Sequence, residues 1–160
     1  MNSGFLHWRV KDSFREYVRT IEDGAEQVSD GALEEDGGFV WPASPVDSPT
    51  RDATLKFCGR VEISAYRGIL AVCLEDPWIT FGETIQLSVV DSMNRKSDAP
   101  RVVVAYLTPG ATNPAASLAS MTEAKVTLAR TGVRIFDDNY PAGTELAPLS
   151  YTVSAASHAA

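Results

Sequence analysis

Apolar residues near the N-terminus recur at helical spacing. Positions 10, 14, 17, 18 and 21 fall on one face of a helix, because each lies three or four residues from another member of the set. The charged residues between them are expected to face solvent; they are Arg9, Lys11, Arg15, Glu16, Arg19 and Glu22. Gly24 is expected to end the helix. The acidic, glycine-rich stretch 23–38 predicts a loop or a short second helix around Gly31–Asp36.

Beyond residue 38 the period of the apolar positions changes to two. Apolar and polar residues alternate from Leu55 to Ser64, which predicts a strand with one buried face. A turn at Ala65–Gly68 then predicts a hairpin with 69–74 as its second strand. Further strands are expected at 39–41, 78–81, 84–90, 101–107, 122–128, 133–136 and 149–153, the last as an edge strand, with loops at 43–52 and 108–120. The pattern predicts a mainly β fold with an N-terminal α-helix: an antiparallel β sandwich or curled sheet on which the one amphipathic helix packs.

Size and charge narrow the function classes. The 160 residues are 44% hydrophobic, enough for one core without cross-links, so we expect a single domain over 1–154 and a flexible tail at 155–160. The formal net charge is −7, and no run of Lys or Arg exceeds two residues. This composition argues against nucleic acid and anionic membrane surfaces as partners.

The N-terminal residues lack the pattern of a signal peptide. Nor does any stretch approach the roughly 18 apolar residues that a membrane span needs. As the sequence stands we expect a cytoplasmic protein, or an extracellular or cell-surface one if the chain is an excised domain.

Cys58 and Cys73 fall in the two strands of the predicted hairpin. A tight turn centred on Tyr66 and Arg67 would pair position 58 with 75 and position 60 with 73, which makes the thiols diagonal neighbours. That separation is too large for good disulfide geometry. We expect both cysteines to be reduced packing residues.

Most sequence signatures of catalysis are absent. The chain has no Gly-rich phosphate loop, no His-Glu-x-x-His, no Cys-x-x-Cys and no Gly-x-Ser-x-Gly. Its two histidines are too few for a zinc site built on several of them. Tyrosine is therefore the polar side chain of most interest, at Tyr17, Tyr66 and Tyr140. Taken alone, each is compatible with an ordinary role, in the core, in a surface turn and in a loop at the core edge.

Four motifs carry a resemblance to a known family. The first is Leu6-His-Trp8 followed by Val10-Lys11-x-Ser13-Phe14-x-x-Tyr17, and the second is Gly38-Phe-x-Trp-Pro42. The third is Phe57-x-Gly59-x-Val61-x-Ile63, continuing to Gly68-x-Leu70 and Pro77-x-Ile79. The fourth is Val126-x-Leu128-x-x-x-Gly132-x-x-x-Phe136, followed by Tyr140-x-Ala-Gly143-x-x-Leu146-x-Pro148. In this order, over about residues 6–153, the chain resembles the HtaA-type haem-binding domains of actinobacterial haem-uptake proteins.

The resemblance implies a β-rich domain that holds haem b through an axial tyrosine from the first helix, and Tyr17 occupies that place. A phenolate suits ferric iron because it is anionic and hard, and a hydrogen-bond donor would stabilise it. The apolar neighbours Val10, Phe14, Val18 and Ile21 are expected to shape the pocket wall. Tyr140 matches a further tyrosine of the family and is expected to play a supporting role.

The chain departs from the family pattern in the hairpin turn. Where the family typically has a Gly-His pair, this sequence reads Ala65-Tyr66. Three outcomes are open: Tyr66 hydrogen-bonds or ligates the iron from the second side, Arg67 assists the phenolate or a haem propionate, or the site has taken another task. His7, just before the helix, is a candidate replacement donor.

Three functions remain at this point. The first is a haem-binding protein for uptake, buffering or transfer, with a haem donor or acceptor protein as partner. The second is a haem-dependent enzyme of specialised metabolism, whose open sixth coordination site acts on a small-molecule substrate. The third is a pocket without haem that binds an apolar ligand or a protein.

Overall fold

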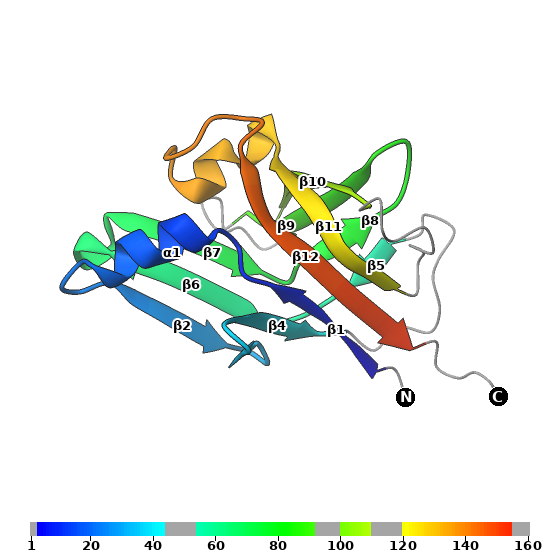
Figure 1. Cartoon of the computed structure of the whole chain (residues 1–160), viewed down its shortest axis with the longest axis horizontal. Helices are drawn as coiled ribbons and strands as arrows, with labels where there is room; N and C mark the ends of the chain where they lie inside the picture. The colour runs from blue at the N-terminus through cyan, green and yellow to red at the C-terminus, as the bar shows by residue number, and fades with distance from the viewer. Residues whose placement is uncertain (1–2, 44–53, 92–99, 110–119, 155–160) are drawn as a thin grey trace.

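The computed structural model describes residues 3–43, 54–91, 100–109 and 120–154, and shows a mainly β fold (Figure 1). Its described strands are β1 Ser3–Trp8, β2 Ala25–Ser29, β3 Leu33–Glu35, β4 Gly38–Pro42, β5 Thr54–Lys56, β6 Arg60–Ala65, β7 Leu70–Glu75, β8 Trp78–Thr80, β9 Ile85–Val90, β10 Arg101–Thr108, β11 Ser120–Leu128 and β12 Glu145–Ser154. The α-helix α1 spans Asp12–Arg19, and two 3-10 helices, η1 and η2, span Tyr66–Gly68 and Arg130–Phe136. No helix in the described ranges is long and apolar enough to cross a membrane.

The described strands form two antiparallel sheets. One has nine strands in the order β3-β4-β1-β12-β11-β10-β9-β8-β5, and the other has three in the order β2-β6-β7. The larger sheet curls, because a single bridge between Ala43 and Phe57 joins the segments that follow β4 and β5, strands near opposite ends of its order. The predicted curled antiparallel sheet with one N-terminal helix is confirmed. Helix α1 packs against β6 of the smaller sheet.

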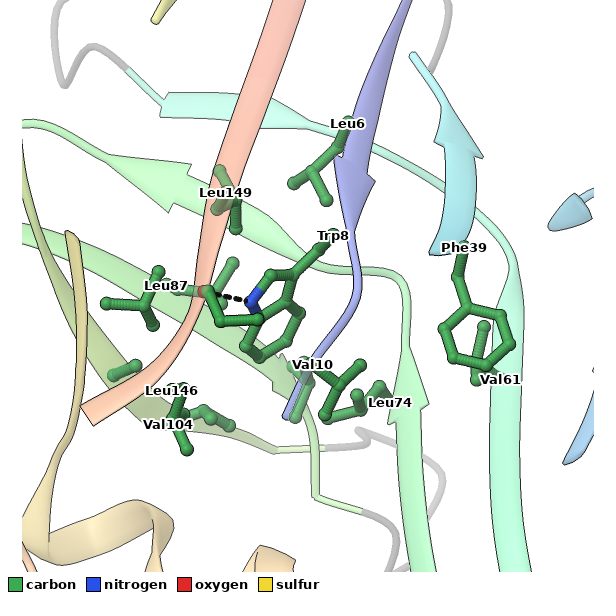
Figure 2. Close-up of a cluster of buried hydrophobic side chains, with 14 of the residues drawn as sticks. Leu6, Trp8, Val10, Phe39, Val61, Leu74, Leu87, Val104, Leu146 and Leu149 are labelled. Atoms are coloured by element: carbon green, nitrogen blue, oxygen red, sulfur yellow. Dashed lines mark hydrogen bonds between the residues drawn. The ribbon is translucent and has the colours of Figure 1, made fainter. Parts of the chain in front are cut away.

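The core lies where the two sheets face each other. Figure 2 shows its centre, with side chains contributed by β1, β4, β6, β7, β9, β10 and β12. Trp8 is fully buried there, and its indole Nε1 donates a hydrogen bond to the Ala147 carbonyl at 2.8 Å. A large aromatic side chain is thus buried without leaving its donor unsatisfied.

The alternating segment 55–64 is buried on one face as predicted, but it forms two strands. The inward-facing apolar side chains are all buried; they are Leu55, Phe57, Val61 and Ile63. The break falls at Gly59, which has φ +128° and where an added Cβ would lie 2.7 Å from the Ala32 nitrogen. Only glycine fits this close approach, so the chain can pass here from the larger sheet into the smaller one.

Helix α1 is shorter than the predicted apolar stripe and is rotated about its axis. Val10 lies before the helix with φ +72°, and Phe14 and Val18 are buried as expected. The third buried residue of the helix is Arg15, predicted to face solvent and only 2% exposed. Its guanidinium donates to the Glu26 carboxylate at 2.6 and 3.0 Å and to the Gly37 carbonyl at 2.7 Å. This burial of Arg15 turns the opposite edge of the helix toward solvent.

Two other predicted elements were wrong, and one predicted strand has a different place in the sheet. Segment 23–38 contains β2 and β3 rather than the predicted loop or short helix, and its polar composition reflects strands that are largely exposed. Residues 133–136 belong to η2, not to a strand. Residues 149–153 lie within β12, which is not an edge strand because β1 and β11 pair with its two sides.

The remaining predicted strands are confirmed within a few residues, in β4, β6 to β9, β10 and β11. In the β6–β7 hairpin Arg60 pairs with Glu75 and Glu62 with Cys73, a shift from the predicted register because η1 lengthens the turn. Cys58 and Cys73 are not joined by a disulfide. The predicted loops at 43–52 and 108–120 and the tail fall almost entirely outside the described residues.

Candidate functional site

An open pocket of about 660 Å³ lies where the end of α1 meets the tip of the β6–β7 hairpin. Figure 1 shows the helix beside β6 and β7, with the turn of the hairpin near the helix end. The lining residues are Tyr17, Thr20, Ile21, Glu22, Asp23, Tyr66 and Arg67. The pocket therefore brings together three of the predicted site residues, Tyr17, Tyr66 and Arg67.

Tyr17 lies on the edge of α1 that faces this pocket. Its side chain is 50% exposed, whereas the sequence predicted a position on the buried stripe. The difference follows from the rotation of the helix, which buries Arg15 in place of Tyr17. The phenol oxygen of Tyr17 lies 2.7 Å from that of Tyr66, and either hydroxyl can be the donor. Two phenols far apart in sequence thus form one hydrogen-bonded pair.

Tyr66 is held in an unusual turn. Tyr66, Arg67 and Gly68 all have positive φ, at 55°, 57° and 89°. Two successive non-glycine residues in the left-handed region are uncommon, because their Cβ atoms approach the backbone. The Asp23 carboxylate compensates for this: its two oxygens accept the Tyr66 amide at 2.9 Å and the Arg67 amide at 2.7 Å.

The hydrogen bonds of the pocket shift the acidity of two groups. The backbone amides of Arg67 and Tyr66 hold the pKa of Asp23 below its usual range, because they stabilise the carboxylate. The hydrogen bond with Tyr17 raises the pKa of Tyr66, with smaller contributions from burial and from the negative charge of Asp23. Tyr66 therefore keeps its proton at neutral pH, beside an ionised Asp23.

Three of the four residues predicted to form the pocket wall lie elsewhere. Val10, Phe14 and Val18 are 2% exposed or less and belong to the hydrophobic core, so they do not line the pocket. Phe14 and Val18 point into the core because α1 buries this face, and Val10, just before the helix, lies in the same core. Ile21, which is partly buried, is the apolar residue of the stripe that reaches the pocket.

Tyr140 and His7 also lie outside the pocket lining. The Tyr140 ring packs edge-on against Phe14 with centroids 6.1 Å apart, and the Lys11 ammonium lies 5.1 Å from its centroid. Burial raises the pKa of Tyr140. His7 is on β1, where its Nε2 lies 3.2 Å from the Glu35 carbonyl of β3.

Sequence reasoning missed Asp23, Thr20 and Glu22. Asp23 lies in the loop between α1 and β2, just before Gly24. Its partners lie 43 and 44 residues further along the chain, and no local pattern reveals such a contact. The fold brings the helix loop and the hairpin turn together, although they are far apart in the sequence.

The sequence and the structure were compared with those of known proteins. The profile of the HtaA family, described as Htaa, matches residues 3–152. The chain belongs to the HtaA family. The C-terminal domain of HtaA from Corynebacterium glutamicum has a similar structure, with a TM-score of 0.72 and 26% identity over 95% of this chain and 97% of that domain.

Two further solved structures of the HtaA family and its relatives share the fold. The N-terminal domain of HtaA from Corynebacterium glutamicum has a TM-score of 0.69 and 22% identity, over 97% of this chain and 98% of that one. The haem-binding protein HtaB of the same organism has a TM-score of 0.64 and 18% identity, over 96% and 94% of the two chains. A comparison with curated protein sequences returned no match.

Proposed function

We propose that this HtaA domain binds ferric haem at Tyr17, for haem uptake, buffering or transfer. One observation carries the proposal: an accessible phenol on α1, hydrogen-bonded at 2.7 Å to a second phenol, borders an open pocket in a chain of this family. A related solved structure is described as a haem-binding protein. Haem b would supply a ferric centre for which a phenolate is a suitable ligand.

The two phenols suit ferric iron if one of them is the ligand and the other is its hydrogen-bond donor. With ferric haem bound, Tyr17 would be the ligand through its phenol oxygen, and Tyr66, whose pKa is raised, would keep its proton and donate a hydrogen bond to that oxygen. Ligands on opposite faces of haem are separated by the iron and the ring plane, whereas these two oxygens are in direct contact. The geometry thus supports Tyr66 as a hydrogen-bond donor over Tyr66 as a second axial ligand.

The surroundings of the phenol pair supply apolar and charged contacts. Ile21 lines the pocket, and Ile69, directly after the turn, is 82% exposed. Exposed apolar side chains beside a pocket suit a flat, mostly apolar ligand. Arg67 lines the pocket, and its guanidinium would pair with a haem propionate, since a charged hydrogen bond to a carboxylate is among the stronger polar contacts.

The same geometry favours a second candidate, a haem-dependent enzyme that acts on a small molecule. Both phenols approach from one side and the pocket is open. A haem bound in this way would keep its other face accessible, as an enzyme requires.

Titration of the purified protein with haemin tests the proposal. We expect a Soret band for the wild type, loss of tight binding in Tyr17→Phe, and an affinity about tenfold to a hundredfold lower in Tyr66→Phe. Tyr106→Phe is the matched control, because Tyr106 is also exposed but lies on β10 outside the pocket. Absence of a Soret change in the wild type would contradict haem binding. Addition of cyanide or imidazole to the complex then separates a carrier with both axial positions filled from an enzyme with one open.

A further inference from the structure

Asp23 connects the two segments that carry the phenols. It lies in the loop between α1 and β2, and both of its carboxylate oxygens accept amides from η1. In the described part of the chain, the hydrogen bonds that join the turn to the helix and its loop are these two and the one between the phenols. Among the described residues, no other side chain of the pocket lining accepts a hydrogen bond from the turn amides.

The turn needs this connection because its backbone is unfavourable by itself. Tyr66 and Arg67 both adopt left-handed φ values, and their amides point out of the hairpin toward the helix loop. Within the turn, the Ile69 amide donates a hydrogen bond to the Tyr66 carbonyl at 3.1 Å. A strained conformation persists only where its surroundings fix it, and the carboxylate is the group that does so here.

We propose that Asp23 is a positioning residue, which holds the turn so that the Tyr66 hydroxyl meets the phenol oxygen of Tyr17. Its role toward iron rests on the proposed function, since Tyr66 matters to haem only if Tyr17 is the ligand. The role of Asp23 in placing Tyr66 is independent of the proposed function and can be measured in the protein without haem. A carboxylate is the side chain that satisfies both backbone amides, because it offers two acceptors; the amide of Asn would accept from one of them and present a donor to the other.

The first experiment uses the protein without haem. In Asp23→Ala the amides of Tyr66 and Arg67 are expected to exchange with deuterium at least about tenfold faster. The ¹³Cζ chemical shift of Tyr66 in Asp23→Ala should move to the value found in Tyr17→Phe, since both changes break the phenol pair. Glu22→Ala is the matched control, because it removes an exposed acidic residue of the same pocket without removing the turn bonds. Unchanged exchange and an unchanged ¹³Cζ shift in folded Asp23→Ala would overturn the proposal.

The second experiment adds haemin. If Asp23 acts through Tyr66, then Asp23→Ala and Tyr66→Phe weaken binding by a similar factor, about tenfold or more, and the double variant is no weaker than either alone. Asp23→Asn should be intermediate, because it keeps one acceptor. Independent, additive losses would overturn the proposal. Failure of the wild type to bind haemin would instead reject the proposed function, and the result without haem would still decide the role of Asp23.

Discussion

At the scale of single residues, the pair Tyr17 and Tyr66 defines the site. Each phenol has an ordinary explanation in the sequence, and only their 2.7 Å contact makes them a unit. The family resemblance pointed to both positions. The resemblance alone could not show whether the two phenols lie on opposite sides of a ligand or in direct contact with each other. Their arrangement depends on the conformation of the turn and on Asp23.

The phenol pair predicts how Tyr66 responds to pH. Because its hydrogen bond with Tyr17 raises the pKa of Tyr66, the pair is intact below the ordinary tyrosine pKa of about 10 and is lost as pH rises through the raised value. Tyr17→Phe should lower the pKa of Tyr66 toward the ordinary value. A pH titration of the tyrosine ¹³Cζ resonances without haem measures this. An identical Tyr66 titration in both proteins would show that the bond does not form in solution.

At the scale of elements, the burial of Arg15 decides which face of α1 reaches the pocket. The hydrophobic pattern correctly placed Phe14 and Val18 in the core. It failed for Arg15 because its partner Glu26 lies on β2, a strand whose polar sequence gives no alternation. Charged residues are rarely buried unless they are paired. A charged residue in a helical pattern is therefore predicted to be exposed when its partner is not evident from the sequence.

The Arg15–Glu26 pair predicts a large and pH-dependent contribution to stability. Arg15→Met leaves Glu26 without its main partner and should lower the free energy of unfolding by about 3 kcal/mol. Arg15→Met/Glu26→Leu should recover part of this loss, since no buried charge is left unpaired. Burial disfavours the Glu26 carboxylate, but Arg15 outweighs it and the pKa is lowered.

The lowered pKa of Glu26 determines how the free energy of unfolding changes with pH. The contribution of Glu26 is present above its unfolded pKa of about 4.5 and is lost as pH falls through the lower folded value. Urea unfolding of the wild type and the double variant between pH 3 and 7 measures it. An equal fall in stability for both proteins on acidification would contradict the assignment.

At the scale of the whole molecule, the curled sheet and the smaller sheet place the helix and hairpin side by side. Periodicity predicted most strands, because burial on one face leaves a period of two in the sequence. It did not predict that 55–64 crosses between sheets at Gly59, or that β12 is internal. Those features depend on strands that are distant in sequence.

The crossing at Gly59 predicts a severe effect for a small substitution. Gly59→Ala should lower the free energy of unfolding by about 2 kcal/mol or more, because its Cβ would meet the Ala32 backbone in a left-handed conformation. Gly143→Ala is the control, since that glycine also has positive φ, 91°, but has nothing within 4 Å of the added carbon. Gly143→Ala should lower the free energy of unfolding by about 1 kcal/mol. Equal costs in urea unfolding would show that the close approach to Ala32 is not limiting.

The resonance Raman spectrum of the ferric haem complex tests the central claim most directly, because iron-bound phenolate has its own ring vibrations. If Tyr17 is the iron ligand, we expect these vibrations in the wild type and in Tyr66→Phe, shifted in the latter because the donor to the phenolate is gone. We expect them to be absent in Tyr17→Phe. Phenolate vibrations that persist in Tyr17→Phe, or that are missing from the wild-type complex, would contradict Tyr17 as the iron ligand.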